Sequence, residues 1–177
     1  MTHRAPLIVV PYQRDWPSKF TSEHSVLQAI FPEPFFQIEH VGSTAVPGLS
    51  AKPIIDIMIG ASSLSEIDER IDAAMGLGYE YMPQHEQAIP LRRFFGKPVV
   101  RPRHFHVHAV TVNSVFWHDH LLFRDALQND SRLTNEYAAL KLQLAQQFGE
   151  DREAYTDAKG AFISSALSAA RISRQRV

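Results

Sequence analysis

A glycine–serine–threonine triplet at 42–44 and an acid that follows it could together handle a phosphorylated ligand. A glycine–serine turn leaves backbone N–H groups free to bind phosphate oxygens, and Ser43 adds a hydroxyl. Asp56 follows Ser43 after twelve intervening residues, inside the apolar run PIIDIMIG. A carboxylate in such a run is expected to be paired, hydrogen-bonded or bound to a metal. An ordinary turn, with Asp56 paired to Lys52, explains the same residues and stays open as the alternative.

Histidines are clustered along the chain, since six of the nine lie between positions 85 and 120. His104, His106 and His108 alternate along one predicted strand, so their side chains share one face. Imidazole suits Zn²⁺ or Mn²⁺ better than Mg²⁺. Asp56, His106 and His108 are therefore predicted to hold one divalent metal. Contact with phosphate or a base, and plain packing, are the alternatives for these histidines.

Basic residues could supply a local positive pocket although the net charge is only −1. Lys52 lies in the loop before Asp56, and Arg103 leads into the strand with the histidines. Tyr155 and Lys159 are four residues apart on a predicted helix, so they share one face. The alternative for each lysine is a solvated surface position. The ten basic positions of interest are Lys52, Arg92, Arg93, Lys97, Arg101, Arg103, Arg124, Lys141, Arg152 and Lys159.

The elements that must position these residues are a mixed sheet followed by helices. Apolar alternation and turn residues predict the strands, and apolar stripes at helical spacing predict the helices. The expected strands lie at 35–41, 53–60 and 103–112, with short strands in YEYMP and LRRFFGKP and an edge strand or extended arm at 7–10. The expected helices lie at 15–29, capped by Asp15 with Pro17 in the first turn, at 63–76 starting from Ser63 or Ser65, and at 114–128, 131–148 and 151–173, each with a Ser or Asp start.

Composition favours a single globular domain over residues 1–177, with the sheet in about 1–113 and helices in about 114–177. Hydrophobic residues make up 45% of the chain, enough for a core. The absence of cysteine excludes disulfides and thiolate chemistry. The near-neutral charge argues against nucleic acid as a partner, and the apolar run at 7–10 is too short for a signal or membrane segment. The cytoplasm is the expected location.

A set of ordered motifs resembles the GrpB family, which is placed in the nucleotidyltransferase-fold superfamily with DNA polymerase β and the kanamycin nucleotidyltransferases. The central motif is HVGSTAVPGLSAKPIIDI, and the others are VPYQRDW, LGYEY, RRFFGK, HFHVH, LLFRDAL, YAALK and DREAYTDAKGAFI. Domains related to this family also occur fused to dephospho-coenzyme A kinase. The resemblance implies an α/β (α+β) nucleotidyltransferase-like fold, a mixed sheet flanked by helices with a helical C-terminal third.

The resemblance also implies roles for single residues. Asp56 matches the first metal-binding acid and is the expected catalytic residue, with Mg²⁺, Mn²⁺ or Zn²⁺ as the metal. The superfamily places a second acid two residues later, and here that position is Met58, whose thioether does not hold Mg²⁺. Helices beside the sheet supply Lys and Arg to the triphosphate in the superfamily. The residues expected to bind phosphate or nucleotide are Gly42, Ser43, Thr44, Lys52, Arg103, Lys141, Tyr155 and Lys159.

Two functions are consistent with these features. The first is a metal-dependent nucleotidyltransferase that binds a nucleotide or another phosphorylated small molecule and transfers a nucleotidyl group to an acceptor. The second is a catalytically degenerate nucleotidyltransferase fold that binds a ligand or assists protein assembly, with a nucleotide, a coenzyme A-like phosphate or a protein as partner. The loss of the second acid at Met58 favours the second.

Overall fold

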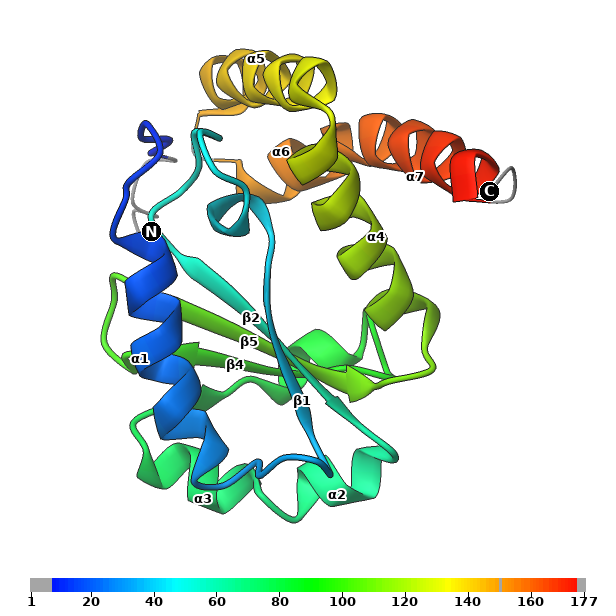
Figure 1. Cartoon of the computed structure of the whole chain (residues 1–177). Coiled ribbons are helices and arrows are strands. Elements are labelled where there is room, and N and C mark those ends of the chain that lie inside the picture. Colours follow the sequence, from blue (N-terminus) through cyan, green and yellow to red (C-terminus); the bar gives the residue numbers. More distant parts are fainter. Residues whose placement is uncertain (1–7, 150, 175–177) are drawn as a thin grey trace.

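The computed structural model describes residues 8–149 and 151–174, and its centre is a five-stranded mixed sheet (Figure 1). The strands are β1 (Gln37–Val41), β2 (Ile55–Ala61), β3 (Glu80–Tyr81), β4 (Arg93–Lys97) and β5 (Phe105–Thr111). Their order in the sheet is β1-β2-β5-β4-β3, with β2 and β5 parallel and the other neighbours antiparallel. The predicted mixed sheet flanked by helices is confirmed.

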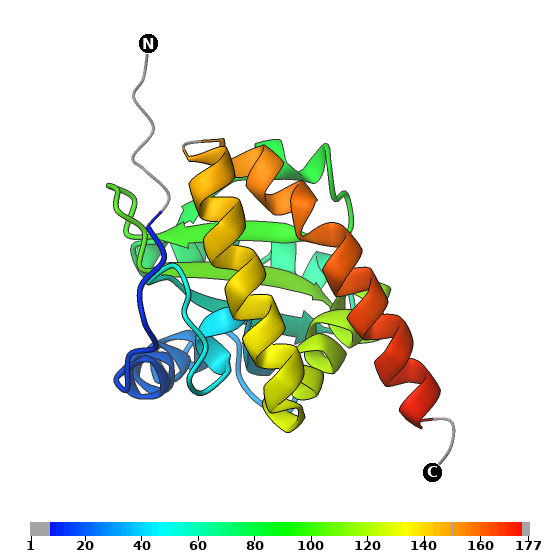
Figure 2. The same cartoon turned by 90° about the horizontal axis from the view of Figure 1, so that it is seen from above.

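Helices cover both faces of the sheet. One face packs against α1 (Trp16–Gln28), α2 (Leu64–Asp68) and α3 (Ile71–Gly76), and the other lies beneath α4 (Val115–Asn129), α5 (Ser131–Phe148), α6 (Arg152–Ala158) and α7 (Gly160–Arg174). Two single 3₁₀ turns, η1 (Ser43–Ala45) and η2 (Pro83–Glu86), lie in the connections. Seen from above, α5 and α7 lie over the sheet and diverge from the short α6 (Figure 2).

Alternation along β2 sends its side chains to two different environments. Ile57 and Ile59 enter the large apolar core beneath α1 and α3, together with Trp16. Asp56 and Met58 lie on the opposite face, toward α4, because successive residues of a strand point to opposite sides. The face beneath α4–α7 is therefore the one that carries the predicted site.

Two predicted helices are interrupted. The helix expected at 63–76 breaks at Arg70, whose guanidinium donates to the carbonyl of Glu66 at 2.8 Å. The Arg70 backbone N–H bonds to the carbonyl of Ile67 at 2.9 Å, so the chain makes a tighter turn there. The helix expected at 151–173 is also two helices, which meet at Lys159 and Gly160.

Side-chain caps begin most of the predicted helices. The residues whose side chains accept a backbone N–H in the first turn are Ser63, Ser114, Asp130 and Asp151. Asp15 is the N-cap residue of α1, as predicted, but its side chain makes no capping bond and instead pairs with Lys19 Nζ at 2.9 Å. Pro17 does lie in the first turn of α1, as predicted.

The segment before α1 contributes little to the sheet. Of the strand predicted at 7–10, Val10 forms an isolated antiparallel bridge with Ala51, and Leu7 lies outside the described residues. Among the helices that the structure describes, none is both long and apolar enough to cross a membrane.

Candidate phosphate-binding site

A glycine at position 42 allows the loop after β1 to pass directly over Asp56. Gly42 has a φ of 72°, a conformation that L residues with a side chain rarely adopt. A Cβ at this position would lie 2.7 Å from Asp56 Oδ2. The chain then makes the single turn η1, whose first backbone N–H groups have no partner within the turn. Ser43 and the loop N–H groups therefore lie beside the acid.

Asp56 is held between two imidazoles from the neighbouring strand. Because β2 and β5 pair in parallel with Asp56 opposite His106, the Asp56 Oδ1 atom lies 3.5 Å from His106 Nδ1 and 3.7 Å from His108 Nε2. Burial alone would raise the pKa of Asp56, but the adjacent imidazoles of His106 and His108 outweigh it and hold that pKa below its usual range. His104, the third histidine of the series, is exposed.

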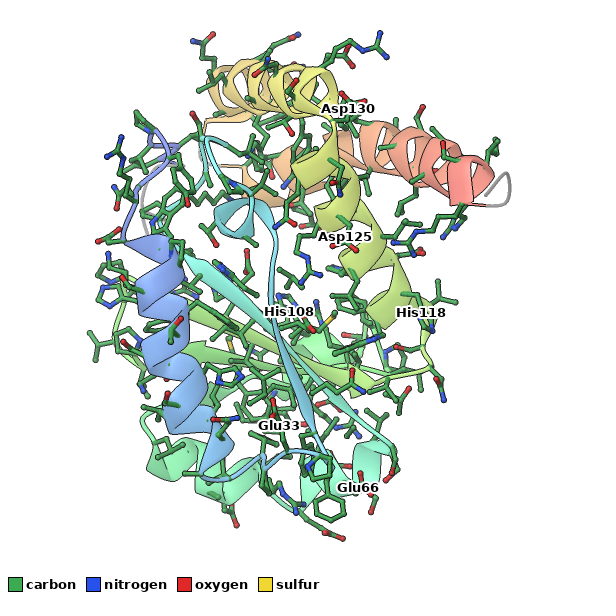
Figure 3. All side chains as sticks on the ribbon, in the orientation of Figure 1. Glu33, Glu66, His108, His118, Asp125 and Asp130 are labelled. Carbon is green, nitrogen blue, oxygen red and sulfur yellow. The ribbon has the colours of Figure 1, made fainter. Side chains whose placement is uncertain are left out.

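Burial lowers the pKa of His108 to about 4, against the opposing effect of Asp56. At neutral pH, His108 is therefore an uncharged imidazole beside an ionised carboxylate. Figure 3 places His108 between the strands and the helical layer, and its ring contacts Phe116 and His120 of α4. His118, two residues before His120, lies on the outer side of α4, as its spacing on a helix requires.

Lys141 brings a buried ammonium group to the same loop from α5. Its side chain is nearly inaccessible, and Nζ donates to Ser43 Oγ at 3.0 Å and to the carbonyl of Ser50. The ammonium also lies 4.9 Å from the ring centre of Tyr137. Burial, followed by repulsion from Lys159, lowers the pKa of Lys141 to about 7. The protein therefore holds Lys141 where its positive charge is incompletely compensated.

Two more lysines approach the ring of Tyr155. Lys52 Nζ lies 4.6 Å and Lys159 Nζ 4.3 Å from the ring centre, so Tyr155 and Lys159 do lie on one face, as predicted from their spacing. Tyr155 is buried, which raises its pKa to about 12. The pKa of Lys159 is lowered by burial, with Asp56 acting in the opposite direction. We call Lys52, Lys141 and Lys159 the lysine cluster.

Thr44 and Arg103 are placed differently from the other predicted site residues. The Thr44 hydroxyl is buried and bonded to His40 Nε2 at 3.0 Å, and His40 stacks on Phe20 on the face of the sheet that α1 covers. Arg103 is buried against β4 and β3, where it pairs with Glu80 and donates to backbone carbonyls of the β4 region. Neither side chain joins the lysine cluster.

Met58 occupies the position of the second acid, and its surroundings are apolar. Its side chain is fully buried against Val41, Val110 and Trp117. In residues 8–149 and 151–174, no three or more His, Cys, Asp or Glu side chains are arranged so that they could hold a metal ion. Asp56, His106 and His108 nevertheless lie together, with Asp56 Oδ1 3.5 and 3.7 Å from the two imidazole nitrogens, and a metal bound by them stays a prediction.

Arg92 lies close to the site but was not among the predicted binding residues. Its Nη1 atom lies 3.4 Å from His108 Nδ1. Adjacent arginines on a strand point to opposite faces, so one of Arg92 and Arg93 had to face the histidines, but the sequence did not show which. Arg93 faces the other way and pairs with Asp68.

The fold corresponds to the nucleotidyltransferase-like class. A structure of the Cid1 poly(U) polymerase with MgGTP bound superposes with a TM-score of 0.53 and 15% identity, covering 78% of this chain and 44% of that one. At this low identity the likeness shows the fold alone.

The sequence pattern of the family described as GrpB protein matches residues 6–169, and the chain belongs to this family. A crystal structure of the conserved protein GrpB from Enterococcus faecalis superposes with a TM-score of 0.81 and 34% identity, covering 92% of this chain and 96% of that one. The glutamate-rich protein GrpB of Alkalihalophilus pseudofirmus is 31% identical over 172 residues, which are 94% of this chain and 97% of that protein.

Proposed function

We propose that the protein binds a nucleotide or another phosphorylated small molecule, with the phosphates on the η1 loop and the lysine cluster. The observation that carries this proposal is the buried ammonium of Lys141 on Ser43 Oγ, with two further lysines around Tyr155. Asp56 is the acid that faces this group of cations. A buried ammonium group beside the Ser43 hydroxyl, with a second lysine whose pKa is lowered by burial, favours an anionic ligand.

Different residues of the site would bind the phosphate oxygens and balance their charge. Ser43 Oγ and the η1 backbone N–H groups would donate to phosphate oxygens, and Lys141 and Lys159 would balance their charge. A bound anion would also raise the pKa of Lys141 and so restore its full positive charge. A bound anion would therefore compensate the charge of Lys141, which the protein alone does not.

We further propose nucleotidyl transfer to an acceptor as the reaction. An acceptor oxygen would attack the α-phosphorus, the bond from that phosphorus to the bridging oxygen would break, and pyrophosphate would leave with the electron pair. An uncharged His108 is a better proton acceptor than Asp56, whose pKa lies below its usual range. Asp56 would then orient the imidazoles, and catalysis would come from positioning and charge.

A ligand-binding or assembly module without catalysis is the second candidate. The fully buried Met58 in its apolar cluster favours it, because the second acid of the superfamily has no place there. In this case the same phosphate contacts would serve recognition only.

Calorimetry of the metal-free protein with ATP, CTP, GTP and UTP tests the proposal, with Mg²⁺, Mn²⁺ or Zn²⁺ present or absent. Nucleotide binding that requires a metal and is lost in Asp56→Ala, together with release of pyrophosphate, would support the transferase. Metal-independent binding without turnover would support the module. A ligand at 100 times its Kd stabilises the fold by about 2.7 kcal/mol, so thermal unfolding gives an independent readout. No binding of any nucleotide would refute nucleotide recognition.

A further inference from the structure

Arg92 provides a second cationic group, on the other side of Asp56 from the lysine cluster. In the sheet order β1-β2-β5-β4-β3, the loop that carries Ser43 follows β1, Asp56 is on β2, and Arg92 immediately precedes β4. His108 on β5 lies between the two, 3.7 Å from Asp56 and 3.4 Å from Arg92. A group bound by Arg92 would thus approach Asp56 from the side opposite to the phosphates.

The guanidinium of Arg92 is oriented by aromatic rings and has no acidic partner. Its central carbon lies 4.8 Å from the ring centre of Phe94 and 5.7 Å from that of Phe116. Within the described residues, its Nε atom is buried without a hydrogen-bond partner, and no carboxylate forms an ion pair with it. An arginine held in this way suits a carboxylate or a phosphate, which it can bind through two parallel hydrogen bonds.

An apolar cavity of about 400 Å³ shares the Phe116 side chain with Arg92. It lies between α4 and α7. Its acidic lining residue, Asp119, is paired with Arg171, and the others are Val115, Phe116, His120, Phe123, Ile163 and Leu167. Phe116 and His120 stack with ring centres 3.9 Å apart, so a pair of aromatic rings lines one side of the cavity. Small-molecule sites are typically cavities of this size with apolar walls and a few polar groups.

We propose that Arg92 and this cavity bind the acceptor, and that the acceptor carries an anionic group attached to a flat, largely apolar ring. Arg92 holds the anion, and the ring packs against Phe116 and His120. That this ligand is the acceptor rests on the proposed function, but its binding to Arg92 and the cavity can be tested separately. The shared chemistry is an anion on an aromatic ring, and both an aromatic phosphate and an aromatic carboxylate meet it.

The test measures the binding of phenyl phosphate, benzoate and inorganic phosphate by calorimetry, with the lysine cluster first saturated by tripolyphosphate. Arg92→Met is compared with Arg93→Met, a matched control because Arg93 is its neighbour in sequence but lies on the opposite face and pairs with Asp68. Circular dichroism confirms that each variant is folded before titration. Ile163→Trp, which fills the cavity and leaves Arg92 in place, tests the pocket for the ring.

We expect phenyl phosphate or benzoate to bind about tenfold more tightly than inorganic phosphate, and Arg92→Met to weaken that binding about tenfold while Arg93→Met does not. Ile163→Trp should remove the advantage of the ring. Equal binding by the two arginine variants, or no advantage of either aromatic anion over phosphate, would overturn the proposal. If tripolyphosphate fails to bind, the proposed function is refuted. The binding of the aromatic anions by Arg92→Met and Arg93→Met then still tests the site at Arg92.

Discussion

Replacing the buried Lys141 with methionine should change how the stability of the protein depends on pH. Methionine keeps most of the length and apolar volume of the side chain and removes the ammonium group. Its loss leaves Ser43 Oγ and the Ser50 carbonyl without this donor, at a cost of about 1 kcal/mol each. It also removes the penalty of holding a positive charge in a buried position. The two effects oppose each other, and only the second depends on pH.

The size of the pH-dependent effect follows from the pKa of Lys141. That pKa falls from 10.5 to about 7 on folding, mainly through burial. Between these values the unfolded chain keeps the proton and the folded protein releases it, so unfolding takes up a proton and the free energy of unfolding rises with pH. Each pH unit well inside this range contributes about 1.4 kcal/mol. From pH 7 to pH 9, the native protein should therefore gain about 2 kcal/mol relative to Lys141→Met.

Urea unfolding at pH 7, 8 and 9 measures this difference, with the fluorescence of the buried Trp16 and Trp117 as probe. Lys19→Met is the control, because Lys19 is half exposed at the surface and pairs with Asp15. The difference between native protein and Lys141→Met should rise by about 2 kcal/mol over this range, and the control should show no such rise. Parallel pH profiles for the native protein and Lys141→Met would refute the assignment of Lys141 as a buried, uncompensated charge.

Three further substitutions test the geometry around Asp56 by the same unfolding assay. Gly42→Ala should lower the free energy of unfolding by about 2 kcal/mol or more, because of the positive φ and the 2.7 Å approach to Asp56. The control Gly76→Ala in α3 should be neutral or slightly stabilising. Equal effects of the two substitutions would contradict the close approach. Asp56→Asn should lower the free energy of unfolding at pH 7 by about 1–3 kcal/mol. This deficit should shrink as the pH falls below about 4, because the stabilisation from the lowered pKa of Asp56 is complete only above the pKa of the unfolded chain. A deficit that persists at low pH would count against the contacts of Asp56 with His106 and His108. Met58→Asp should cost about 3 kcal/mol or more, because it buries a carboxylate in an apolar cluster, and a fully stable variant would show that the second acid can be restored.

Strand alternation made part of the site predictable. The spacing in 53–60 and 103–112 places Asp56 on one face of its strand, and His106 and His108 together on one face of theirs. That these faces coincide depends on the parallel pairing of β2 with β5, which follows from the fold and not from local spacing. The prediction that Asp56, His106 and His108 share one metal assumed this pairing.

Contacts that depend on tertiary packing were not predictable from local patterns. Lys141 was expected to contact the ligand, but its bond to Ser43 joins residues 98 positions apart and depends on how α5 crosses the sheet. The pairing of Arg103 with Glu80 likewise depends on β3 and β4 lying beside β5. The Thr44 side chain points away from Asp56 because its hydroxyl is hydrogen-bonded, at 3.0 Å, to His40 on the other face of β1.

Calorimetric titration of the protein with tripolyphosphate at pH 7.5, in two buffers of different ionisation enthalpy, tests phosphate binding at the lysine cluster most directly. The difference between the two heats gives the number of protons taken up. We expect binding with proton uptake, because the anion raises the pKa of Lys141 from about 7. Lys141→Met should weaken binding about tenfold and abolish the uptake, while Lys19→Met changes neither. No binding, or the same affinity and the same proton uptake in all three proteins, would contradict a phosphate site built on Ser43 and Lys141.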